Sequence, residues 1–228
     1  MKYRAEIDGL RGLAVLGVVL FHTGVPELSG GFVGVDIFFV ISGYLITKIL
    51  AAEMDAGTFS VRRFYERRIR RIFPALFCVS MVSAIAAALL LLPADLINFG
   101  KSLASAALFV SNVFFWRQAG YFDEPSALKP LLHTWSLSVE EQFYIFFPLA
   151  LALLSRFGQR ATRVWLGLFC AISLALSVWA VRNAPSAAFY LGPMRAWELL
   201  LGAIVASGAF PALKTAFCKN FFQRPAWA

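Results

Sequence analysis

Charged residues are scarce in this sequence. Asp, Glu, Lys and Arg make up only 15% of the 228 residues, and hydrophobic residues make up 60%, whereas soluble domains contain about 25% and about 45–50% respectively. The mean hydropathy is +0.71, so the apolar surface exceeds what a soluble core can bury, and the excess must face acyl chains. The composition argues against a secreted or cytosolic globular protein and predicts an integral membrane protein.

Cysteine and histidine are also rare. The three cysteines, Cys78, Cys170 and Cys218, lie far apart in or beside apolar stretches, and neither of the two histidines is near them at metal-ligand spacing. We therefore interpret the cysteines as core or lipid-facing residues and expect no metal ion.

The basic residues indicate topology. The formal charge is +8, but Lys and Arg lie in short blocks between apolar stretches, as the positive-inside rule predicts for cytoplasmic loops. We therefore expect no nucleic-acid partner. The first apolar stretch follows Lys2 and Arg4, and no small-residue cleavage site comes after it. It is predicted to stay as the first helix, with the N-terminus in the cytoplasm.

The apolar stretches predict an all-α fold, a polytopic transmembrane bundle of about six spanning helices. A seventh stretch, Phe99 to Trp116, is rich in Ser and Ala, and it could span, lie in the interface or re-enter from one side. The charge distribution favours an interfacial or re-entrant segment, because the basic residues are then more concentrated on the cytoplasmic side. The six candidate spans are Leu10 to Val25, Phe32 to Ala52, Ile72 to Leu92, Leu131 to Leu154, Val164 to Val181 and Trp197 to Phe210.

Arg11 and His22 are ionisable residues in the first apolar stretch. They are eleven positions apart, so on a helix they share one face with about 16 Å between them. Ionisable groups inside apolar helices are candidates for function because they are costly there. The alternative is that Arg11 is a cytoplasmic anchor and His22 an interfacial residue that reaches toward water.

Asp36 is a candidate partner for His22. The connection from Gly24 to Gly31 is short and predicts a hairpin of the first two helices, which places Asp36 at a depth comparable with His22. A carboxylate there could accept from one imidazole nitrogen and leave the other free to act as a base. The alternative is an outer-surface Asp beside a helix start.

An arginine-rich block, RRFYERRIRRIFP, precedes the third apolar stretch. Topology and binding of anionic headgroups explain it adequately. The use of Arg rather than Lys also suits bidentate recognition of phosphate. The Gly-rich run Gly30 to Gly34 and the pair Ser42-Gly43 match no nucleotide-binding loop, and we interpret them as sites of close helix packing.

A last cluster is HTWSLSVEEQFY, from His133 to Tyr144. Glu140 and Glu141 lie at the mouth of an apolar helix, and His133 and Glu140 are seven apart, so they share a face if the segment is helical. Acidic residues in a first helical turn are also common partners of the helix dipole, which is the alternative.

Five blocks of the sequence together resemble acyltransferase family 3 of the membrane-bound O-acyltransferases. The resemblance covers nearly the whole chain and implies transfer of an acyl group, typically acetyl from acetyl coenzyme A, to hydroxyls of extracytoplasmic glycans. Such glycans are polysaccharides of the cell envelope and include lipopolysaccharide O-antigen, exopolysaccharide and peptidoglycan. The five blocks are EIDGLRGLAVLGVVLFH, GGFVGVDIFFVISGYLIT, RRIRRIFPAL, LLHTWSLSVEEQFY and PMRAWELLLGA.

The resemblance also implies location and extent. Members are multi-pass proteins of the bacterial cytoplasmic (inner) membrane, and their membrane domains contain more helices than this sequence predicts. Residues 1–228 are accordingly expected to be an incomplete acyltransferase-3-like transmembrane domain, which lacks the C-terminal helices and any SGNH hydrolase-like domain. In such proteins Arg11 and His22 correspond to an essential pair, and Arg68 and Arg70 match an Arg-x-Arg element.

The sequence and the resemblance together predict a site. Acyl-CoA would bind from the cytoplasmic side, His22 would act on the glycan acceptor from the outer side, Asp36 would orient His22, and membrane lipids would surround the bundle. A lipid or glycan transporter and a non-catalytic truncated remnant are the alternatives. The residues predicted to bind acetyl-CoA are Arg11, Arg67, Arg68, Arg70 and Arg71; those predicted to bind the acceptor are His133, Trp135, Ser136, Glu140 and Glu141.

Overall fold

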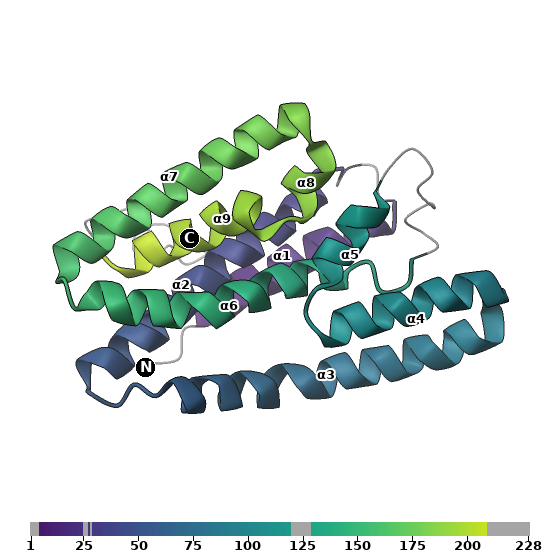
Figure 1. Ribbon diagram of the computed structural model, residues 1–228, viewed down its shortest axis with the longest axis horizontal. Helices are drawn as coiled ribbons and strands as arrows, with labels where there is room; N and C mark the ends of the chain where they lie inside the picture. The colour runs from purple at the N-terminus through teal and green to yellow at the C-terminus, as the bar shows by residue number, and fades with distance from the viewer. Residues whose placement is uncertain (1–4, 25–26, 28, 120–128, 209–228) are drawn as a thin grey trace, which may run out of the picture.

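The computed structural model describes residues 5–24, 27, 29–119 and 129–208. Within these residues every regular element is a helix, which confirms the predicted all-α class (Figure 1). The helices are α1 (Ala5–His22), the 3₁₀ helix η2 (Gly31–Val33), α2 (Gly34–Asp55), α3 (Val61–Leu90), α4 (Pro93–Ala107), α5 (Ser111–Gln118), α6 (Thr134–Ser155), α7 (Gln159–Asn183), α8 (Pro185–Tyr190) and α9 (Gly192–Ala206).

The long helices form a polytopic bundle. Among the described residues, four helices are long and apolar enough to cross a membrane, namely η2 with α2, α3, α6 and α7. The shorter α1 and α9 lie in the same bundle, with α9 packed between α2 and α7 (Figure 1). All six predicted spans thus coincide with helices, although the predicted ends at Val25 and Phe210 lie outside the described residues, as does Cys218.

Helix α3 is longer than the hydropathy predicted. It begins at Val61 instead of Ile72, so the arginine-rich block forms its first turns and does not precede it. Ser60 caps this end, because its Oγ accepts a hydrogen bond from the backbone N–H of Arg63 at 3.4 Å. Arg and Glu favour the helical conformation. A hydropathy scale scores them as unfavourable because it measures only transfer into lipid, so it does not detect this part of the helix.

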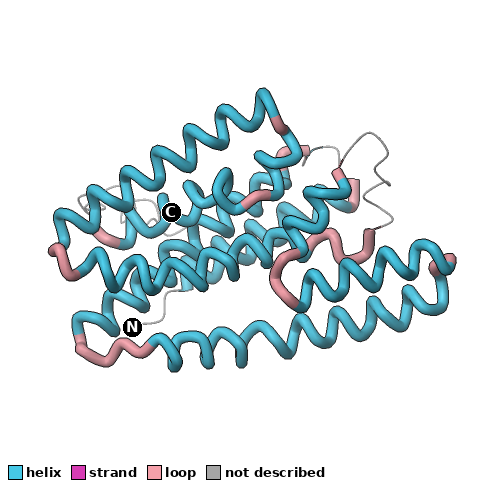
Figure 2. Tube along the Cα trace, viewed as in Figure 1, coloured by secondary structure: helices cyan, strands magenta, loops and turns pink. Residues whose placement is uncertain are grey.

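The seventh apolar stretch lies within α4 and α5, and the chain turns between them. Between these helices Phe109 has a φ of +54°, which interrupts the helical path. Helix α4 runs back along α3, α5 turns away again, and α6 then runs in the direction opposite to α3 (Figures 1 and 2). The chain thus turns back within this stretch, and its placement relative to the membrane stays a prediction.

Polar side chains fasten α5 to its neighbours. The amide of Gln142 on α6 donates to Asn112 Oδ1 at 2.8 Å and to the carbonyl of Phe109 at 2.8 Å. Asn112 donates in turn to the carbonyl of Tyr190 on α8 at 3.1 Å. Irregular backbone at membrane depth is tolerated only where protein groups satisfy it. These amides therefore allow the chain to reverse inside the bundle.

Glycines bring α2 and α9 into direct contact. A Cβ added at Gly43 would overlap the backbone of Leu199, and one added at Gly202 would overlap the backbone of Val40. This confirms the close packing predicted for Ser42-Gly43. Small residues at such crossings let helix backbones approach, and that contact replaces the hydrophobic driving force that lipid cannot supply.

Replacing Gly43 with leucine should separate α2 from α9. The leucine side chain has no space against Leu199, so the variant should lose about 1–3 kcal/mol of stability or more. Gly12 on α1 is the matched control, because a Cβ there meets nothing within 4 Å. Thermal unfolding of the two purified variants in detergent would measure the difference, and equal melting temperatures would contradict the close contact.

Candidate functional site

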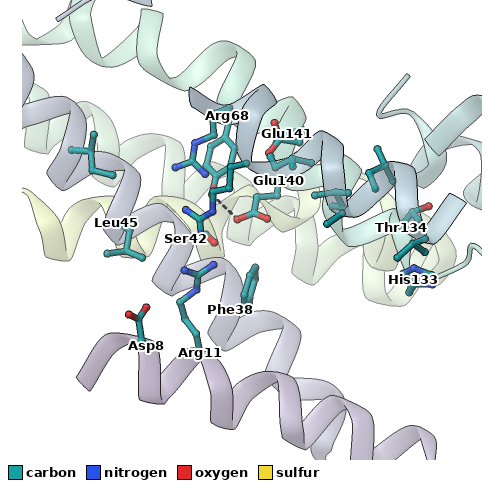
Figure 3. A pocket seen from close by; sticks show the side chains of 18 residues that line it. Asp8, Arg11, Phe38, Ser42, Leu45, Arg68, His133, Thr134, Glu140 and Glu141 are labelled. Atoms are coloured by element: carbon teal, nitrogen blue, oxygen red, sulfur yellow. Dashed lines mark hydrogen bonds between the residues drawn. The ribbon is translucent and has the colours of Figure 1, made fainter. Parts of the chain in front are cut away.

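A cavity of about 570 Å³ lies between α1, α2, α3 and the N-terminal half of α6 (Figure 3). Its apolar wall comes mainly from α2 and α3, and its polar residues come from all four helices. It unites six of the predicted site residues in one space, Arg11, Arg68, Arg71, His133, Glu140 and Glu141. Asp8, Ser42, Thr134 and Tyr144 also line it, and the sequence did not identify these four as site residues.

Arg11 and Arg68 enter the cavity from different helices. Arg11 rises from α1, and its guanidinium lies 5.1 Å from the centroid of the Phe38 ring. Arg68 comes from α3, with its guanidinium 4.6 Å from the centroid of the Tyr144 ring (Figure 3). Aromatic faces stabilise a cation and hold it in place. The two positive groups are thereby held at one end of the cavity, away from His133 and Thr134.

Two buried carboxylates lie beside these arginines. Glu140 accepts a hydrogen bond from the Tyr144 hydroxyl at 2.5 Å. Glu141 follows it on α6, and its Oε1 is buried without a hydrogen-bond partner among the described residues. An unpaired buried acceptor is costly, and this one belongs to a residue that lines the cavity. It is therefore suited to accept a hydrogen bond from a ligand.

Two of the four α3 arginines predicted to bind the donor do not line the cavity. Arg67 forms an ion pair with Glu53 at 2.6 Å, and Arg70 forms one with Glu66 at 2.7 Å. Successive residues turn by about 100° around a helix, so adjacent arginines cannot all face one side. The predicted cluster is divided, and Arg68 and Arg71 are the pair that faces the cavity.

Asp36 does not orient His22, which corrects the sequence prediction. Asp36 accepts a hydrogen bond from Arg195 Nη1 at 3.0 Å. His22 is exposed at the end of α1, and its Nδ1 bonds to the carbonyl of Val18 at 2.8 Å. The helix is continuous from Arg11 to His22, so both residues follow one stripe as predicted, but His22 does not line the cavity.

Arg195 organises a separate buried charge cluster that sequence reasoning missed. It donates to Asp36 and, at 2.6 Å, to Glu198, whose side chain is 0% exposed. Its guanidinium also lies 5.5 Å from the Trp135 ring and 5.7 Å from the Phe189 ring. The signal was present in the block PMRAWELLLGA, where two opposite charges three residues apart fall in an apolar helix.

The residues predicted to bind the acceptor separate into two groups. His133, Glu140 and Glu141 line the cavity. Trp135 packs against Arg195 instead, and Ser136 donates back to the carbonyl of His133 at 3.2 Å. Desolvation lowers the pKa of His133, and a hydrogen bond to the backbone of Pro130 partly offsets the effect. His133 is therefore neutral at pH 7 and can donate or accept a hydrogen bond.

The polar groups of the cavity suit an anionic organic ligand better than a metal ion. Among the described residues, no group of three or more His, Cys, Asp or Glu side chains is placed to hold a metal. Two planar guanidinium groups that converge from separate helices match the oxygens of a phosphate. The apolar α2 and α3 walls beside them offer a path for an uncharged arm.

Comparison with known proteins identifies the family. A family described as an acyltransferase domain matches residues 4–212. The chain belongs to this acyltransferase family. O-acetyltransferase OatA of Staphylococcus aureus strain NCTC 8325 / PS 47 is 38% identical over 211 residues, which cover 90% of this chain and 34% of the relative. The OatA protein of strain COL gives the same values.

The chain corresponds to one part of these relatives. A further Staphylococcus aureus protein, from strain MSSA476 and provisionally named an O-acetyltransferase, is 38% identical over 212 residues; the match covers 90% of this chain and 35% of that protein. The chain thus spans about a third of the length of the curated relatives it matches. No solved structure matches it. Family membership and the apolar helices together make it a multi-pass membrane protein.

Proposed function

We propose that this chain is the membrane-embedded part of an O-acetyltransferase that moves acetyl from acetyl-CoA to a hydroxyl of a glycan outside the membrane. The observation that carries the proposal is the cavity in which Arg11 and Arg68 converge from two helices beside an apolar wall. Relatives named O-acetyltransferases support the reaction class. The chain would lie in a bacterial inner membrane with the N-terminus of α1 in the cytoplasm.

The cavity fits the two ends of an acyl-CoA molecule. Arg11, Arg68 and Arg71 would bind the nucleotide phosphates, each arginine offering a planar pair of donors. The cavity extends along α6 from Tyr144 to His133, eleven residues, which correspond to about 16 Å of helix. The pantetheine arm would lie along this length, with one of its amide N–H groups donating to the free oxygen of Glu141.

His22 would supply the base at the far end of α1. Nδ1 would donate to the Val18 carbonyl, which in the neutral ring leaves Nε2 as the nitrogen that can accept a proton. Nε2 would remove the proton of the glycan hydroxyl as the oxygen attacks the thioester carbonyl. The carbon–sulfur bond breaks, and the CoA thiolate leaves and takes a proton. Attack by His22 itself, followed by transfer to the glycan, gives the same products.

Substitution of His22 or Arg11 tests the proposal. We expect His22→Ala to reduce acetyl transfer by about 100-fold or more, the contribution of a general base. Arg11→Ala should chiefly raise the concentration of acetyl-CoA that gives half-maximal transfer. The measurement is transfer of radiolabelled acetyl from acetyl-CoA to membrane glycan by the purified chain in liposomes.

Controls separate this function from its alternatives. Thr23→Ala changes the residue next to His22, whose hydroxyl bonds to its own helix at the Leu20 carbonyl, and it should leave transfer unchanged. Full transfer by His22→Ala at equal protein level would refute the base assignment. A transporter would move glycan or lipid without consuming acetyl-CoA, and a non-catalytic remnant would fail to bind acetyl-CoA even when folded.

A further inference from the structure

A second hollow lies on another side of the bundle, between α6, α7 and α9. It is a groove of about 460 Å³ that shares no lining residue with the arginine-lined cavity. Its walls are apolar side chains, including Phe146, Phe147, Leu166 and Phe169. An apolar groove that faces hydrocarbon is filled by hydrocarbon, because water there would lack hydrogen-bond partners.

Small residues create the groove. Ala150 on α6 and Gly192 and Ala196 on α9 line it between the larger phenylalanines. The polar side chain at its margin, Gln142, already uses its amide on Asn112 and on a backbone carbonyl. The groove therefore presents an apolar surface, and a ligand needs no polar group along its length to bind there.

The groove is long enough to hold the acyl chain of one leaflet. From Val139 to Leu154 it follows α6 for fifteen residues, or about 22 Å. One leaflet supplies about half of the ~30 Å hydrocarbon core. A single lipid acyl chain that enters at the Leu154 end would thus reach Gln142 near the middle of the membrane.

The Leu154 end of the groove leads to exposed positive charge. The turn that follows α6 carries Arg156, and Arg160 lies in the first turn of α7; both are exposed. Phe157, in the same turn, and Trp165, on α7, are exposed, and aromatic residues of this kind mark the boundary between hydrocarbon and headgroups. The charge and the aromatic residues together fix where a lipid headgroup would lie.

We propose that this groove binds one acyl chain of an anionic phospholipid from the leaflet at the Arg156 end. The chain lies between Phe146 and Phe169, and the phosphate is bound by Arg156 and Arg160. A neutral lipid gains the same apolar contact but loses the charge attraction, which is worth about 1 kcal/mol for each basic residue near a membrane surface. The site does not depend on the proposed acetyl transfer.

Native mass spectrometry of the purified chain tests the site. Palmitoyl-oleoyl phosphatidylglycerol and the phosphatidylcholine with the same chains are added to the protein in detergent. We expect the phosphatidylglycerol adduct to be favoured by roughly 30-fold, from two arginines. Equal retention of the two lipids would overturn the role of the arginines.

Two pairs of variants test the groove and the charge separately. Ala150→Phe places a ring in the groove from an exposed position and should remove most of both adducts, whereas Ala86→Phe on the exposed side of α3 should not. Arg156→Gln with Arg160→Gln should abolish the preference for phosphatidylglycerol. Arg62→Gln with Arg63→Gln removes the same charge at the same end of the bundle (Figure 1) and should keep the preference.

The remaining outcomes are also decisive. Equal lipid retention in Ala150→Phe and Ala86→Phe overturns the groove site. Equal effects of the two double-glutamine variants would mean that the whole basic surface attracts the lipid, and this overturns the specific role of Arg156 and Arg160. A dimer that Ala150→Phe converts to monomer, with no lipid bound in either form, would assign the groove to a second copy of the chain instead.

Discussion

Replacing Arg195 with alanine is expected to destabilise the bundle by about 3–5 kcal/mol, the usual cost of leaving a buried charge without its partner. The Arg195 side chain is 15% exposed, and its guanidinium holds Glu198, whose side chain is 0% exposed. It also joins α9 to α2 through Asp36. Truncation removes the cation that both carboxylates share, and it leaves Trp135 and Phe189 without the group against which they pack.

Thermal unfolding of purified protein in detergent measures this loss of stability. Two further variants test whether unpaired buried charge is its cause. Adding Asp36→Asn and Glu198→Gln to Arg195→Ala should recover much of the stability, because no buried charge is then left unpaired. Glu198→Gln alone should be tolerated, since Asp36 still faces Arg195. A melting temperature for Arg195→Ala equal to that of the wild type would show that the cluster contributes nothing to the fold.

Removing Arg68 from the cavity should weaken binding of acetyl-CoA by about 10- to 100-fold, because a hydrogen bond to a charged group contributes about 1.5–3 kcal/mol. This prediction rests on the proposed function. Arg71 should behave in the same way, since it lines the same cavity. Raising the salt concentration should weaken binding to the wild type more than to Arg68→Ala, because the variant has less charge attraction to screen.

Titration of acetyl-CoA into protein reconstituted in nanodiscs provides the measurement. Arg63→Ala is the matched control, because Arg63 is exposed on the same helix and does not line the cavity. Its affinity should be that of the wild type. An equal loss for Arg63 and Arg68 would mean that the arginine-rich block attracts the donor only through its total charge.

The sequence predicted the helices well because transfer into lipid is a local property. Each candidate span corresponds to a helix, and the segment that contains Phe99 to Trp116 is divided between α4 and α5. The start of α3 was misplaced by hydropathy because Arg and Glu are good helix formers that lipid-transfer scales count as breaks. The cap at Ser60 was the local signal that could have located it.

The partner of Asp36 could not be predicted from spacing. Asp36 and Arg195 are 159 positions apart, and no periodicity links residues on different helices. The hairpin suggested His22 because it places the two residues at comparable depth. The i,i+3 pair of Arg195 and Glu198, by contrast, could be read directly from the helix period.

The division among the arginines was partly within reach of the sequence. A helical period applied across the block places Arg68 and Arg71 on one side and turns Arg70 away from it, but Arg67 lies about 40° from Arg71 and is not separated by the period. In the structure Arg68 and Arg71 line the cavity, and Arg67 and Arg70 form ion pairs elsewhere. What spacing could not supply was the identity of the opposite wall, Arg11 and Glu140.

Helix α3 contributes one wall of the arginine-lined cavity, yet only 6% of its apolar core segment is buried. It is held near its first turns by the hydrogen bond from the Tyr65 hydroxyl to the carbonyl of Ile145 at 2.7 Å, and beyond them mainly by α4. Segments with so little packing move at low energetic cost. Helix α3 can therefore swing about its attachment at Tyr65 and widen the opening of the cavity. Helices α2 and α9, which pack closely at their glycines, would stay in place.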